Sequence, residues 1–108
     1  MRPYRNYEES LKARLQDTDY AREYLCVALS EYEEDGDIEA FLLAVRDVAE
    51  ARGGMSKLSE RTSLTRQSLY KALSENGNPH LKTMGEILHG LGFKLSIEPL
   101  EDRTQAEV

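Results

Sequence analysis

The chain has 108 residues, and its 14 Lys and Arg residues against 20 Asp and Glu residues give a formal net charge of −6. This length supports one modest hydrophobic core and excludes a second independent domain. The sequence has no apolar run long enough to span a bilayer, and its charged N-terminus lacks a signal-peptide core. We therefore expect a single domain over residues 1–108, located in the cytoplasm.

The first half, residues 7–53, predicts a set of N-terminal helices. A weak helical pattern runs from Tyr7 to Leu15, and Asp17 is placed to cap a second helix that ends near Glu33. A third helix follows a cap at Asp37 and stops at Gly53. Its apolar residues recur at intervals of three and four and define one face: Ile38, Phe41, Leu42, Val45, Val48 and Ala49. We expect this face to support the segment that follows.

Residues 54–73 have the spacing of two short helices joined by a tight turn. Leu58 and Thr62 lie four apart on the first helix, Leu64 fills the turn, and Thr65 is placed to cap the second. The second helix buries a stripe formed by Leu69, Ala72 and Leu73. The same pattern also fits an ordinary helical hairpin, so the choice between the two depends on the polar residues of the second helix.

Those polar residues favour a helix that reads DNA. Side chains rich in hydrogen-bond donors lie outside the apolar stripe, as base edges and phosphates require. We expect Arg66 and Gln67 to reach base edges and Ser68 and Lys71 to contact phosphates, while Tyr70 fits either a base contact or packing. The complete set of candidate DNA-binding residues is Thr65, Arg66, Gln67, Ser68, Tyr70, Lys71 and Lys57.

The last third predicts a closing helix, a strand and a tail. The helix runs from Leu81 to Leu91, so that residues 54–92 hold the helix-turn-helix and its closing helix. Residues 93–98 alternate apolar and polar, and residues 100–108 are expected to be disordered. A lone strand leaves backbone groups unpaired, so we expect it to pair with a second copy through Phe93, Leu95 and Ile97. The alternative is a frayed arm packed by Phe93 alone.

Charge is distributed unevenly along the chain. Residues 1–53 hold seven Lys and Arg against thirteen Asp and Glu, whereas residues 54–94 hold six against three. Residues 95–108 hold one against four. The local excess of positive charge coincides with the helix-turn-helix, where a phosphate backbone requires it.

Several segments together resemble the addiction-module antidote proteins, which are the antitoxins of two-gene toxin–antitoxin operons. They are Gly-Met-Ser-Lys-Leu, Ser-Leu-Thr-Arg-Gln-Ser-Leu-Tyr-Lys-Ala-Leu-Ser and Gly-Asn-Pro-His-Leu-Lys-Thr-Met, with matching segments upstream, so the resemblance covers about residues 7 to 99. It implies a mainly all-α fold, a five-helix lambda-repressor-like helix-turn-helix domain with a short C-terminal strand. One departure is Ser63, because most such motifs have a glycine with positive φ at this turn position. A residue other than glycine in that conformation costs on the order of 1 kcal/mol.

The resemblance also implies two partners. These are a palindromic double-stranded operator, bound by a homodimer that represses its own operon, and a RelE/HigB-like RNA-cleaving toxin, neutralised by direct binding. Because proteins that handle RNA are usually basic, we expect the acidic residues 1–53 to hold the toxin, with contacts from tyrosines such as Tyr20, Tyr24 or Tyr32. The alternative is that these acids only solvate the helices and the tyrosines belong to the core.

No residue pattern indicates catalysis, a metal or a cofactor. His80 and His89 lack a carboxylate or thiol at ligand spacing, and the single cysteine, Cys26, has no partner. Two further functions stay open. One is a free-standing regulator of the phage-repressor type, and the other is an acidic interaction module that does not bind DNA.

Overall fold

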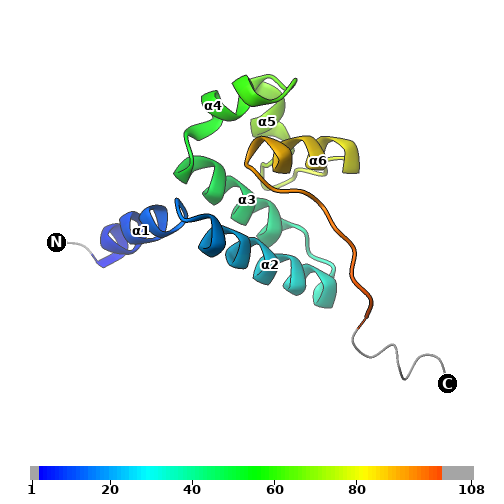
Figure 1. Ribbon diagram of the computed structural model, residues 1–108, viewed down its shortest axis with the longest axis horizontal. Coiled ribbons are helices and arrows are strands. Elements are labelled where there is room, and N and C mark those ends of the chain that lie inside the picture. Colours follow the sequence, from blue (N-terminus) through cyan, green and yellow to red (C-terminus); the bar gives the residue numbers. More distant parts are fainter. Residues whose placement is uncertain (1–2, 101–108) are drawn as a thin grey trace.

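The computed structural model describes residues 3–100, with side chains from residue 7 onward. This part of the chain is mainly helical (Figure 1), and none of its helices is both long and apolar enough to cross a membrane. Its helices are α1 (Pro3–Arg14), α2 (Thr18–Asp35), α3 (Glu39–Ala51), α4 (Gly54–Arg61), α5 (Arg66–Ala72) and α6 (Leu81–Gly90). The expected count of five is therefore wrong. Every segment with helical periodicity, including the weak first one, forms a helix of its own.

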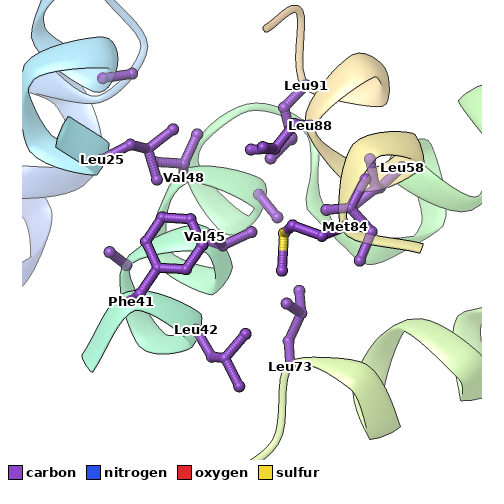
Figure 2. Packing of buried hydrophobic residues seen from close by; sticks show 14 of the residues in the cluster. Leu25, Phe41, Leu42, Val45, Val48, Leu58, Leu73, Met84, Leu88 and Leu91 are labelled. Atoms are coloured by element: carbon purple, nitrogen blue, oxygen red, sulfur yellow. The ribbon is translucent and has the colours of Figure 1, made fainter. Parts of the chain in front are cut away.

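Helix α3 lies at the centre of the molecule, with α2 on one side and the group α4, α5 and α6 on the other (Figure 1). The side chains of Phe41 and Val45 project from α3 into a cluster that also receives Leu25 from α2 and Met84 from α6 (Figure 2). Val45 and Val48 are completely buried. The apolar face predicted for this helix is thus the centre of the hydrophobic core.

Local capping explains where several helices begin and end. The Asp17 carboxylate accepts a hydrogen bond from the Tyr20 amide at 2.9 Å, which confirms it as the N-cap of α2. Asp37 was expected to cap α3, but the N-cap position belongs to Ile38, and Asp37 instead accepts from the Glu39 amide at 3.0 Å. Helix α3 ends as predicted, because Arg52 is its C-cap and Gly53, with φ of 120°, is the residue that follows.

The segment after α6 begins with a fixed turn. The Phe93 amide donates to the Leu88 carbonyl at 2.8 Å and the Gly92 amide to the His89 carbonyl at 3.0 Å, which is the Schellman pattern. Gly92 has φ of 97°, a conformation that side chains disfavour. Helix α6 therefore ends at a turn that sets the direction of the following residues.

The strand expected at 93–98 is not present in the single chain. Residues 93–100 have no regular secondary structure, and within the described range no strand lies alongside them. A strand needs a hydrogen-bonded neighbour, which one copy of this chain does not provide there. Leu95 and Ile97 are 43% and 97% exposed. The expected tail beyond residue 100 lies outside the described residues.

Arg52 connects three distant parts of the chain. Its guanidinium donates to the Gln16 carbonyl at 3.1 Å and to the Thr18 hydroxyl at 3.3 Å, both at the junction of α1 and α2. The same group lies 5.7 Å from the centre of the Phe93 ring, within the range of a cation–π interaction. Arg52 thereby links the end of α3 to the N-terminal helices and to the start of the C-terminal segment.

Two glycines of α6 provide a matched test of the packing. A Cβ at Gly90 would lie 2.7 Å from side-chain atoms of Leu58 and Thr62 of the α4 region, whereas a Cβ at Gly85 would meet only Leu95 at 3.7 Å. We expect Gly90→Ala to destabilise the protein by about 1–3 kcal/mol, because Leu58 is buried and has no room to move. Gly85→Ala should stabilise it by up to about 1 kcal/mol through helix propensity. Urea unfolding measures both, and equal effects of the two substitutions would contradict the close approach at Gly90.

Candidate nucleic-acid interface

Helices α4 and α5 and the turn between them occupy the segment for which the sequence predicts a helix-turn-helix. Leu58 of α4 and Leu69 of α5 are buried, as is Leu73 at the C-cap of α5. The Thr65 hydroxyl oxygen accepts from the Ser68 amide at 3.0 Å, which confirms Thr65 as the N-cap of α5. The apolar spacing and the cap therefore give the local structure that the sequence predicts.

Side-chain hydrogen bonds close the turn. The Ser59 hydroxyl donates to the Leu64 carbonyl at 2.9 Å, and the Leu64 amide donates to the Thr62 hydroxyl oxygen at 3.1 Å. Thr62 itself donates to the Leu58 carbonyl at 3.0 Å. Leu64 is half-buried and packs against the core, as expected for the residue that fills the turn.

Ser63 does not adopt the conformation expected for it. Among the described residues every non-glycine has negative φ, so the positive φ and its energetic cost do not arise at this position. Instead, the Ser63 amide donates to the Glu86 carboxylate at 3.1 Å, and the Ser63 hydroxyl also binds this carboxylate. These hydrogen bonds, with a smaller contribution from Lys82, lower the pKa of Glu86 from its ordinary value of 4.5. Glu86 thereby attaches the turn to α6.

The end of α5 is held in a similar way. Arg46 of α3 donates to the Leu73 carbonyl at 2.8 Å, which satisfies a carbonyl that has no partner within the helix. Neither Arg46 nor Glu86 was identified from the sequence, since each is separated from its partner by more than twenty residues.

The candidate DNA-reading side chains are all on the surface. Tyr70 is 48% exposed, so packing into the core is excluded for it. Two members of the set are engaged in capping, because the Thr65 hydroxyl also donates to the Ser68 hydroxyl oxygen at 3.0 Å. Exposed positions on α5 are held by Arg66, Gln67, Ser68, Tyr70 and Lys71, and Lys57 is exposed on α4. Four polar or aromatic side chains on this seven-residue helix, Arg66, Gln67, Tyr70 and Lys71, thus have no side-chain hydrogen bond or ion pair to any other described residue.

The tyrosines of the N-terminal half differ in exposure. Tyr20 and Tyr24 are half-buried against the core, whereas Tyr32 is 36% exposed. The Tyr24 hydroxyl donates to the Asp47 carboxylate at 2.7 Å, and the pKa of Tyr24 is raised by burial and, to a smaller extent, by this acceptor. In the described part of the chain no three His, Cys, Asp or Glu side chains are grouped as metal ligands.

Comparison with known proteins identifies relatives. Residues 7–99 match a protein family described as "Probable addiction module antidote protein". The chain is also 32% identical over 78 residues to an uncharacterized protein of Haemophilus influenzae, an alignment that covers 72% of this chain and 79% of the relative. No solved structure shows significant similarity to the chain.

The Glu86 contact predicts a pH-dependent contribution to stability. A carboxyl whose pKa is lowered by folding stabilises the folded state above its unfolded pKa, and this stabilisation is lost as the pH falls through the folded pKa. We expect Glu86→Gln to be less stable than the parent at pH 7 and equal to it once the pH is below the lowered pKa of Glu86. Urea unfolding at a series of pH values measures this difference. A deficit that stays constant down to pH 3 would assign the effect to packing and not to the charge.

Proposed function

The chain belongs to the family of addiction module antidote proteins, and from this premise we propose that it is a DNA-binding antitoxin that represses its own operon and neutralises a RelE/HigB-like toxin. Membership in the family indicates a toxin–antitoxin module and a partner toxin. The identity of the toxin, the DNA target and the dimer belong to the proposal. The proposed setting is the cytoplasm, and the proposed action is by binding alone, without catalysis or cofactor.

The observation that supports DNA binding is the exposed row on α5. The helix buries Leu69, is capped by Thr65, and is fixed at its far end by Arg46, so its outer side chains project from a rigid support. Arg66 and Gln67 lie in its first turn, where helix-turn-helix proteins contact base edges. A helical hairpin that served only packing would not need this surface to be both rigid and rich in donors.

The charge distribution is compatible with a polyanionic ligand. The basic residues of the segment 54–94 are all exposed: Lys57, Arg61, Arg66, Lys71, Lys82 and Lys94. Since the segment has a net charge of +3, six minus three, attraction to phosphates operates locally although the whole chain is acidic. Because one protomer alone should bind DNA with modest affinity, a dimer that contacts two half-sites at once would bind the operator more tightly.

Dimerisation through the segment 93–98 is the second part of the proposal. Leu95 and Ile97 have no regular hydrogen-bonded partner strand in one copy, and both are exposed. Pairing of this segment with its counterpart across a two-fold axis would satisfy the backbone groups and match a palindromic operator. Phe93 is already packed against the core, so its role in the dimer is to fix the start of the strand.

Salt-dependent binding to the DNA upstream of the gene separates this proposal from the two alternatives. An acidic interaction module would not bind that DNA with a measurable salt slope. A free-standing regulator would bind it but would have no toxin encoded beside it.

We expect two substitutions on α5 to affect DNA binding differently. Gln67→Ala should cost about 1–3 kcal/mol on the cognate operator and relax specificity, because it removes a base contact. Lys71→Ala should weaken binding to all sequences alike and reduce the salt slope by about one, because it removes a phosphate contact. Fluorescence anisotropy with cognate and scrambled duplexes measures both. Equal losses on the two duplexes for Gln67→Ala would exclude this residue from base recognition.

Removal of the C-terminal segment should convert a dimer to a monomer. Deletion of residues 95–108 retains the Phe93 contacts with the core and Arg52, so the fold should be preserved. Operator affinity should then fall by orders of magnitude, although the helix-turn-helix is unchanged, because two half-sites are no longer linked.

The matched control is deletion of residues 101–108 alone, which keeps the proposed strand and should remain dimeric. Sedimentation velocity gives the oligomeric state of each variant. A dimer that persists without residues 95–108 would place the contact elsewhere, with the N-terminal helices as the next candidate.

A further inference from the structure

An open groove of about 390 Å³ runs between α2 and α3. Two small residues of its lining are buried, Ala28 and Ala44, which are 8% and 5% exposed. Larger side chains form its walls, and the described residues that line it are Tyr20, Glu23, Tyr24, Val27, Ala28, Glu31, Ala40, Leu43 and Ala44. The groove is therefore mainly apolar and aromatic.

The walls of this groove expose apolar surface that the fold does not use. Val27 is 55% exposed and Leu43 is 49% exposed, although each is one helical turn or less from a buried residue of its own helix. Figure 1 shows α2 on the side of α3 that faces away from α4 and α5. The groove is thus also separate from the proposed DNA-reading surface.

Charge around the groove has one sign. Among the residues that the structure describes, Glu23 and Glu31 are the only charged ones that line the groove, and α2 as a whole carries six acids against the single base Arg22. Arg22 approaches Glu23 at 3.7 Å, but both side chains are more than half exposed, so this pair neutralises little of the surface. A ligand with complementary charge must be basic.

We propose that this groove binds a basic amphipathic helix of the toxin. The inference rests on the proposed function, and it locates toxin binding at one site within residues 1–53. The apolar side of the helix contacts Val27, Leu43 and the tyrosine walls, and its lysines or arginines lie beside Glu23 and Glu31. This arrangement is the helix-in-groove mode of recognition, in which an apolar stripe supplies affinity and the flanking charges supply selectivity.

The geometry of the groove favours a helix as the ligand. Helices α2 and α3 are consecutive and joined by a short loop, and a third helix packs naturally into the groove between two such helices. The hydrogen bond from Tyr24 to Asp47 holds one wall in place before binding, which reduces the side-chain entropy lost in the complex.

The first test replaces an apolar wall residue. Leu43→Glu places a charge in the groove at a half-exposed position, and Leu29→Glu places the same charge on α2 at a residue that is 39% exposed and outside the lining. The probe is the purified product of the reading frame adjacent to this gene, titrated against each full-length variant. We expect Leu43→Glu to weaken binding by at least about thirtyfold, as for a central interface residue, and Leu29→Glu by less than about threefold.

A second test changes only the charge. The double variant Glu23→Lys with Glu31→Lys should slow association strongly at low salt, and the difference should shrink at high salt. Its control is Glu33→Lys with Glu34→Lys, which changes the net charge by the same amount on exposed positions of α2 outside the groove. Equal effects of the two pairs would overturn the assignment of the groove, because general attraction alone would explain them.

Operator binding and thermal unfolding of each variant show whether the fold is retained. If the parent protein binds the adjacent gene product and Leu43→Glu binds it equally, the groove is excluded while the antitoxin function stands. If the parent protein does not bind this product at all, the proposed function fails together with the groove.

Discussion

Burial of α3 is the interaction on which the other elements depend. Val45 and Val48 have no exposed surface, and both α2 and α4 pack against this helix. Helices α4 and α5 have only eight and seven residues, too few to be stable in water by themselves. The helical structure of α4 and α5 therefore depends on their packing against the core, and the hydrogen bond from Arg46 of α3 fixes the C-terminal end of α5. The position of the candidate reading helix is consequently a property of the whole domain.

Periodicity and capping chemistry predicted most of the helices because both are local. The apolar face of α3 and the caps at Asp17 and Thr65 could be identified from neighbouring residues alone. The contact between Ser63 and Glu86 could not, because helix packing brings together residues that are 23 positions apart. The segment after Phe93 shows a different limit, since alternation marks residues suited to a strand but one copy supplies no partner for it.

The acidic and basic parts of the chain lie on different helices of the domain. Helix α2 carries five more acids than bases, whereas the segment 54–94 carries three more bases than acids. Helix α3 lies between α2 and the pair α4 and α5, so the two regions of opposite charge occupy different sides of the molecule (Figure 1). The net negative charge of the chain therefore hides the basic region, and the local charge of each surface is the better guide to the charge of the partner that it attracts.

The turn after α6 has a consequence for the energetics of any partner that pairs with the C-terminal segment. Gly92 and the Phe93 amide fix the exit direction, and the Arg52 guanidinium holds the Phe93 ring. The side chain of Leu95 then lies beside Gly85 of α6, 3.7 Å from the position that a Cβ on Gly85 would occupy. Ordering one residue from a flexible chain costs about 1–2 kcal/mol of backbone entropy. For the first residues of this segment that cost is met during folding, so binding has to order only the remainder.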